Sequence, residues 1–116
     1  MTGSSSRTQP EGKIKIVTRT KQFINMAVWE VEAGTTGLRG GDSGHGSRTY
    51  LRFRDQASTD MRVEVAPYRD EITLVLGGDA ELVNLIAGLE FAVAVLKNAV
   101  DSPISKTAAT GWRLVD

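Results

Sequence analysis

Ile72-Thr-Leu-Val-Leu-Gly-Gly-Asp-Ala-Glu-Leu82 is the stretch in which the hydrophobic pattern changes from that of a strand to that of a helix. Apolar residues alternate along its first half, which is typical of a half-buried strand. Gly77-Gly78 then interrupts the strand, and Asp79 is a favourable N-cap for a helix. The apolar residues beyond it recur with helical spacing as far as Ser102-Pro103, which ends a helix. We therefore predict one long helix over residues 79–101.

The predicted helix is apolar around more of its circumference than one face of a sheet can cover. One apolar row consists of Leu82, Leu85, Ile86, Leu89, Val93 and Leu96. Small residues that would allow another helix to approach closely are Ala87, Gly88, Ala92 and Ala94. A core helix of a monomer and a helix shared with a partner subunit both fit this pattern. We favour the second interpretation and expect a homodimer or higher oligomer formed through the 79–101 helix.

Five segments before the helix have the composition of strands. They span residues 13–20, 23–31, 47–54, 61–65 and 71–76. Most of them alternate apolar and polar residues, and the links between the last three are short and turn-like. We therefore predict an α+β fold, in which an antiparallel β-meander of about five strands precedes a helix that packs on the sheet.

This α+β domain is predicted to cover residues 13–101. Residues 1–12 are polar, with no apolar centre, and we expect them to form a disordered N-terminal tail. Residues 102–116 are expected to form a C-terminal tail or docking arm. The short apolar segment over residues 111–115 would then be either an extra edge strand or the part that docks.

Composition excludes several classes of protein. The chain has 116 residues, which suits one domain, and its 14 basic and 14 acidic side chains give a net charge of zero. The absence of cysteine excludes a disulfide scaffold and Cys-ligated metal sites. No apolar signal segment stands near residue 1, and the run Leu82–Val100 contains charged residues that disfavour a membrane span. We therefore expect a cytoplasmic protein that does not bind a membrane.

Glycine is concentrated in one place, because six of the 12 glycines fall within residues 34–46. This segment is too long and polar for a tight hairpin, and a flexible connector is one interpretation of it. Glycines also let backbone N–H groups approach an anion closely, and the planar fork of arginine suits phosphate. We expect the loop to bind a phosphate-containing small molecule such as a nucleotide. The predicted ligand-binding residues are Arg39, Gly40, Gly41, Asp42, Ser43, His45, Arg48 and Tyr50.

Gly41-Asp-Ser-Gly44 matches the tetrapeptide around the nucleophile of chymotrypsin-like proteases, but that mechanism also needs a separate histidine and an aspartate to orient it. The only histidine, His45, lies two residues after Ser43 in the same loop. Neither a Walker loop nor a dinucleotide fingerprint fits, since Gly-Lys-Ser/Thr and a βαβ unit are both missing. A lone histidine is also weak evidence for a metal. We predict no catalytic residue, metal or cofactor, and regard an enzyme as the less expected class.

Basic residues of the predicted strands provide an alternative site. The residues expected on the outer face of the sheet are Lys13, Lys15, Arg19, Arg48, Arg52, Arg54 and Arg62. Basic side chains interleaved with an aromatic suit single-stranded nucleic acid, although a solvated face with ion pairs to Glu64 and Glu71 fits equally well. In this alternative the nucleic-acid-binding residues are Lys15, Tyr50, Arg52, Arg54 and Arg62.

The order of elements resembles two known groups of proteins. The meander and long helix, with the junction over residues 72–82, resemble the single-stranded-DNA-binding transcriptional coactivator fold, whose helices pair in a dimer. The chain is also similar in size and arrangement to small phage anti-defence proteins that sequester nucleotide immune signals through arginines and loop amides. The matching residue types are Arg39, Asp42, His45 and Arg48. This second resemblance implies a non-enzymatic oligomer that holds its ligand unchanged, which is the function we expect.

Overall fold

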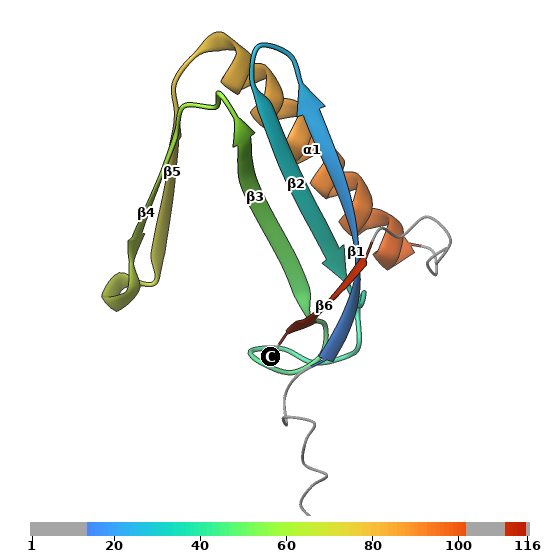
Figure 1. The fold of residues 1–116 in the computed structure, drawn as a ribbon. Coiled ribbons are helices and arrows are strands. Elements are labelled where there is room, and N and C mark those ends of the chain that lie inside the picture. The colour runs from blue at the N-terminus through green and yellow to red at the C-terminus, as the bar shows by residue number, and fades with distance from the viewer. Residues whose placement is uncertain (1–13, 102–110, 116) are drawn as a thin grey trace, which may run out of the picture.

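The computed structural model describes residues 14–101 and 111–115. Its elements in chain order are β1 (Ile14–Ile24), β2 (Val28–Thr35), β3 (Thr49–Ala57), β4 (Met61–Ala66), a 3₁₀ turn (Pro67–Arg69), β5 (Glu71–Leu76), α1 (Asp79–Asp101) and β6 (Gly111–Val115). Figure 1 shows α1 packed along one face of a sheet, with β4 and β5 forming a hairpin to one side. The predicted α+β class and the helix over residues 79–101 are confirmed. The tail predicted for residues 1–12 and the C-terminal segment over 102–110 lie outside the described residues.

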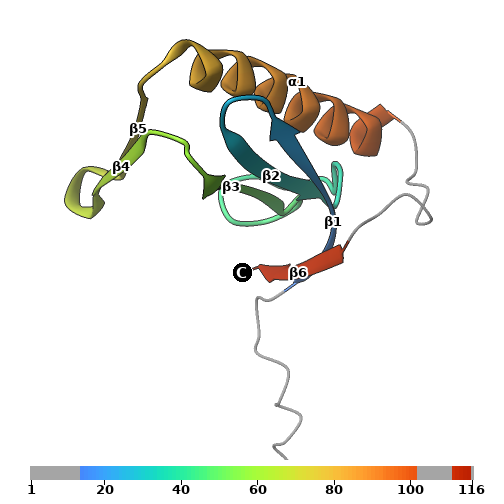
Figure 2. The same cartoon turned by 45° about the horizontal axis from the view of Figure 1, so that its top comes forward.

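The strands form two antiparallel sheets rather than one meander of five. β3, β2, β1 and β6 lie side by side in that order, whereas β4 pairs only with β5. The predicted antiparallel strands are all present, but β4 and β5 pair only with each other, so they form a separate two-stranded sheet. Of the two alternatives for residues 111–115, the structure shows the edge strand, with Val115 opposite Ile14 of β1. Figure 2 shows that the sheet curls, so that β6 lies on the side away from α1.

The turn between β1 and β2 lies at residues 25–27, whereas the sequence predicted a break at 21–22. Asn25 shapes this turn, because its Oδ1 accepts a hydrogen bond from the Ala27 N–H at 3.0 Å. The Asn25 Nδ2 donates to Oδ1 of Asn84 in α1 at 3.0 Å, and the Asn84 Nδ2 donates to the Ala27 carbonyl at 3.4 Å. β1 is therefore longer than predicted and β2 begins five residues later, at Val28, because the turn is stabilised by a helix side chain 59 residues away.

The hydrophobic core lies between β2 and α1. Its buried residues are Trp29, Val31, Ala33 and Ala92. Trp29 stacks on Phe53 of β3, with ring centroids 5.0 Å apart. Gly88 lets α1 lie close to this layer, because a Cβ at residue 88 would be 2.7 Å from the Trp29 ring. Gly88 and Ala92, which the sequence suggested for helix pairing, are therefore used against the chain's own sheet.

The same packing decides which side of α1 is covered. The helix residues buried against other parts of the chain are Glu81, Asn84, Gly88 and Ala92. Most of the apolar row identified in the sequence lies elsewhere on the helix. Its members Leu82, Ile86, Leu89 and Val93 are each about half exposed. One long side of α1 therefore has no cover from the described chain.

Replacing Gly88 with valine should destabilise the protein by about 1–3 kcal/mol, because the added carbons must displace Trp29 or Val31. Urea denaturation would measure this loss in the free energy of unfolding. Ala94→Val is the control, since Ala94 is exposed on α1, and it should change stability by less than about 0.5 kcal/mol. Equal stabilities of the two variants would contradict the close contact.

Candidate functional site

The Gly-rich loop that was predicted to bind a ligand joins β2 to β3, and both of its ends are held in place. The Thr36 N–H donates to the Arg48 carbonyl at 3.0 Å, and the Arg48 N–H donates to Oγ1 of Thr36 at 3.1 Å. Gly37 lies against the end of α1, where a Cβ would be 2.9 Å from the carbonyl oxygen of Ala99. The loop therefore starts from a defined position beside the C-terminus of the helix.

The tip of the loop is a tight turn closed by a hydrogen bond from the His45 N–H to the Asp42 carbonyl at 3.2 Å. Its two central residues, Ser43 and Gly44, have φ of 50° and 98°. Gly46 has φ of 89°, and a Cβ there would lie 2.5 Å from the backbone of the facing segment. Positive φ and this close approach explain why glycine is so frequent here. The glycines therefore give the loop a specific folded shape.

Arg48 occupies the inside of the loop. Its Nη2 donates to the Gly44 carbonyl at 2.8 Å, and its Nη1 donates to the carbonyls of Gly46 and Ser47, each at 3.3 Å. Its Nε is buried and has no hydrogen-bond partner among the described residues. A cation bound to these carbonyl oxygens reduces the repulsion that they would exert on an anion. Most of the Arg48 guanidinium therefore stabilises the shape of the loop. Only its buried Nε has no hydrogen-bond partner among the described residues.

The other predicted ligand residues fall into two groups. Those that are exposed together on the loop are Arg39, Gly40, Gly41, Asp42, Ser43 and His45. Tyr50 lies beyond the loop on β3 and is partly buried, with the Arg113 guanidinium 5.9 Å from the centre of its ring. The six loop residues are therefore all exposed in one loop, whereas Tyr50 has different neighbours. A ligand-binding role for each of them stays a prediction.

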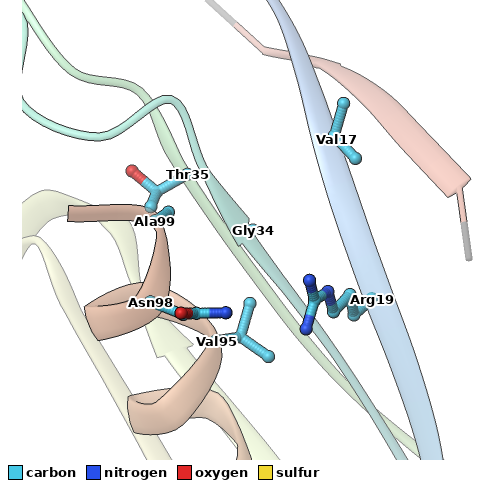
Figure 3. Close-up of a pocket in the computed structure, with 7 residues that line it drawn as sticks. All are labelled: Val17, Arg19, Gly34, Thr35, Val95, Asn98 and Ala99. Carbon is cyan, nitrogen blue, oxygen red and sulfur yellow. The ribbon is translucent and has the colours of Figure 1, made fainter. Parts of the chain in front are cut away.

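A groove of about 450 Å³ lies beside the root of the loop, and its charged lining residues are Arg19, Lys97 and Asp101. Figure 3 shows Arg19 pointing from β1 toward Val95 and Asn98 of α1, at a smaller cavity of about 10 Å³. That cavity has room for about one water molecule. The C-terminal end of a helix carries partial negative charge, which stabilises a cation and opposes an anion. The end of α1 therefore opposes a phosphate in this groove and favours a cation such as Arg19 beside it.

The sheet face opposite α1 carries a network of charged side chains that the sequence pattern did not reveal. Glu32 is 1% exposed, and its Oε2 accepts a hydrogen bond from Thr18 Oγ1 at 2.6 Å. Its Oε1 accepts from Arg52 Nε at 2.8 Å and from Arg113 Nη2 at 3.0 Å. Arg52 also donates from Nη2 to Oε2 of Glu30 at 2.6 Å. The sequence contains one indication of this network. Glu30 and Glu32 are two residues apart, and residues with this spacing lie on the same face of a strand.

These contacts lower the pKa of both carboxyl groups below the ordinary value of 4.5. For Glu30, the hydrogen bond from Arg52 is the largest cause of the lowered pKa. For Glu32, burial alone would raise the pKa, but the hydrogen bonds from Thr18, Arg52 and Arg113 together outweigh it. Both carboxylates are ionised at neutral pH and balance the two arginines. This network therefore presents little free positive charge to a ligand.

The residues of the nucleic-acid alternative do not form one surface. Lys15 and Arg19 are four residues apart on β1, so their side chains lie on the same face of the sheet. This is the face that carries α1. Lys15 lies there over the Trp112 ring, 5.0 Å from its centre. Arg52 is on the opposite face with its glutamates, and Arg62 is on the separate hairpin. The prediction of a single basic outer face is therefore wrong. Of that set, the exposed Arg54 and partly buried Tyr50 remain near Arg52 on β3.

Comparisons with protein-family models, curated proteins and solved structures found no match to this chain. Within residues 14–101 and 111–115, no three histidine, aspartate or glutamate side chains come together as metal ligands. In the same part of the chain, no helix has the length and apolar character needed to cross a membrane. The candidate site therefore rests on the geometry of the Gly-rich loop.

Acid should weaken the buried network in a predictable direction. A carboxyl whose pKa is lowered by folding contributes stability above its unfolded value of 4.5, and this contribution is lost as the pH falls through the folded value. Glu32→Gln should reduce stability at neutral pH by about 3 kcal/mol, because it leaves Arg52 and Arg113 without their shared carboxylate. The variant should then lose less stability than the parent on acidification.

Urea denaturation at about pH 7 and about pH 4 would test this linkage. Glu64→Gln is the matched control, because Glu64 is exposed and lies 3.8 Å from Arg62 in a surface ion pair. That variant should stay within about 0.5 kcal/mol of the parent at neutral pH. The same acid-induced loss in Glu32→Gln and in the parent would show that Glu32 is not a source of the pH dependence.

Proposed function

We propose that the chain is a cytoplasmic, non-enzymatic protein that sequesters a phosphate-containing small ligand at the Gly-rich loop, residues 34–48. The observation that carries this proposal is the loop itself. Arg39, Ser43 and His45 expose hydrogen-bonding groups around a tight turn, and Arg48 engages the carbonyl oxygens behind them. Such a surface suits the oxygens of a phosphate group.

The chemistry of the loop favours a nucleotide within this ligand class. Arg39 and Arg48 outnumber the single carboxylate of Asp42, so the loop has an excess of one positive charge. A phosphate would take the arginine and backbone donors, while Asp42 would accept from a ribose hydroxyl or a base amine. A nucleotide immune signal, as the resemblance to anti-defence proteins implies, is the most specific form of this proposal.

Sequestration is proposed rather than catalysis because of the surroundings of His45. In residues 14–101 and 111–115, no hydrogen bond joins the His45 ring to Ser43 or Asp42, although all three are in the same loop. A histidine that activates a nucleophile needs such a bond and a third group to orient it. The ligand should therefore leave the protein chemically unchanged.

We also propose that the exposed side of α1 is the interface of a homo-oligomer. Leu82, Ile86 and Leu89 are half exposed there. Contiguous apolar surface of this kind on a protein marks a site of association.

Nucleotide binding can be tested with a panel of mono-, di- and cyclic nucleotides, using the shift in melting temperature as the readout. Arg39→Ala should weaken binding of any nucleotide that shifts the parent by about 10-fold to 100-fold, because a charged hydrogen bond is lost. Mass analysis of the recovered ligand should show it unchanged.

Arg54→Ala is the matched control, because Arg54 is also exposed but lies on β3 outside the loop. It should bind as the parent does. The proposal is overturned if no nucleotide of the panel shifts the parent, or if the two arginine variants lose binding equally. Conversion of the ligand would replace sequestration with catalysis.

A further inference from the structure

The hairpin formed by β4 and β5 has one entirely apolar face, which we call the hairpin face. The strand register brings its six side chains together as three cross-strand pairs. These pairs are Met61 with Leu76, Val63 with Leu74, and Val65 with Ile72. The opposite face is mostly polar and includes Arg62, Glu64, Thr73 and Glu71. The hairpin is therefore amphipathic, as expected of a two-stranded sheet that packs on something apolar.

Only the base of the hairpin face is covered in the described chain. Met61 and Leu76 pack against the core, and Met61 Sδ accepts a hydrogen bond from Trp29 Nε1 at 3.4 Å. Toward the tip, Val65 is 63% exposed and Ile72 is 72% exposed. Figures 1 and 2 show the hairpin projecting away from α1. A two-stranded hairpin is marginally stable in water without further packing, so this face needs a partner.

A second apolar surface runs along α1, and we call it the α1 stripe. It consists of Leu82, Ile86, Leu89, Val93, Leu96 and Val100. Alternating steps of four and three residues separate its members, which is the heptad spacing of helices that pack against a partner. Apart from the partly buried Leu96, they are 44% to 55% exposed. Within residues 14–101 and 111–115, the five exposed members are not covered by the sheet or by the hairpin.

We propose that the α1 stripe of a second copy packs on the hairpin face, and that the contact is made twice in a reciprocal pair. This inference rests on the proposed α1 interface, not on ligand binding, and names what occupies that interface. The hairpin face continues from Met61 and Leu76, which already pack against the core. A second helix laid on it would meet the same kind of surface as α1 meets on β2.

The dimensions of the two surfaces agree. Strands of six residues give the hairpin a length of about 20 Å. The α1 stripe extends for about 27 Å, so the hairpin would cover most of it. The half-exposed side chains of both surfaces amount to roughly 700 Å² per copy, and a reciprocal pair would bury about 1,400 Å², which is the size of a stable interface.

A second copy explains both surfaces at once. A foreign partner that binds one of them would leave the other exposed, whereas a symmetric pair covers each hairpin face and each α1 stripe with one kind of contact. Each copy carries one hairpin face and one α1 stripe, so a reciprocal pair covers both surfaces on both copies and leaves no further copy to be added.

Light scattering on the full chain tests the assembly. The parent should have twice the mass of the 12.5 kDa chain at micromolar concentration. Val65→Glu in the hairpin face and Leu89→Glu in the α1 stripe should each raise the dissociation constant at least tenfold. Val75→Glu is the matched control, because Val75 lies opposite Arg62 on the other face of the hairpin. It should leave the pair intact, and circular dichroism would confirm that all three variants are folded.

Cross-linking identifies the surfaces that touch, and the absence of cysteine from the chain makes this test clean. Val65→Cys mixed with Leu89→Cys should be joined by a short bismaleimide. Val75→Cys mixed with Leu89→Cys should be joined far less. A monomeric parent would overturn both this inference and the proposed α1 interface. A dimer that Val65→Glu leaves intact, or in which Leu89→Cys cross-links only to itself, would overturn the hairpin contact alone. Ligand binding at the loop is measured separately.

Discussion

The contact between Gly88 of α1 and the Trp29 ring of β2 determines where the other elements lie. Because residue 88 has no side chain, α1 lies directly against the Trp29 ring there, and the contact fixes the distance of the helix from the sheet and which of its sides faces the sheet. Trp29 is held in turn by the Phe53 ring and by the sulfur of Met61. One side chain therefore joins the helix, the larger sheet and the base of the hairpin.

The distribution of charge follows from the two faces of the sheet. On the face away from α1, Glu30 and Glu32 neutralise Arg52 and Arg113, so these arginines hold the curled sheet together rather than face a ligand. Arg48 is used in a similar way inside the loop. Arg39 is left as an exposed cation at a segment whose backbone already has an unusual shape. The number of arginines in the strands therefore overestimates the basic surface of this protein, because several of them are bound to other groups of the chain.

The helix was predictable because its signals are local, namely Gly77-Gly78, Asp79 and the proline at 103. The Gly-rich loop was located for the same reason. The β1–β2 turn was not, because it depends on Asn84 of a distant helix. Strand alternation correctly separated the two faces of β1 but could not tell which one α1 covers. Strand alternation also could not show that β4 pairs with β5 and not with β3, because a strand has the same alternating pattern whichever neighbour it pairs with.

The position of β6 has a kinetic consequence. β1 lies between β2 and β6, and its residue Ile14 pairs with Val115, so the sheet contains contacts between residues about a hundred positions apart. Contacts of this kind slow folding, because a long loop must close before they form. During synthesis, β1 to β3 and α1 can assemble while the outer edge of β1 is still open. Arg113 then arrives on the last strand and supplies the final hydrogen bond to Glu32, so completing the buried network coincides with closing the sheet.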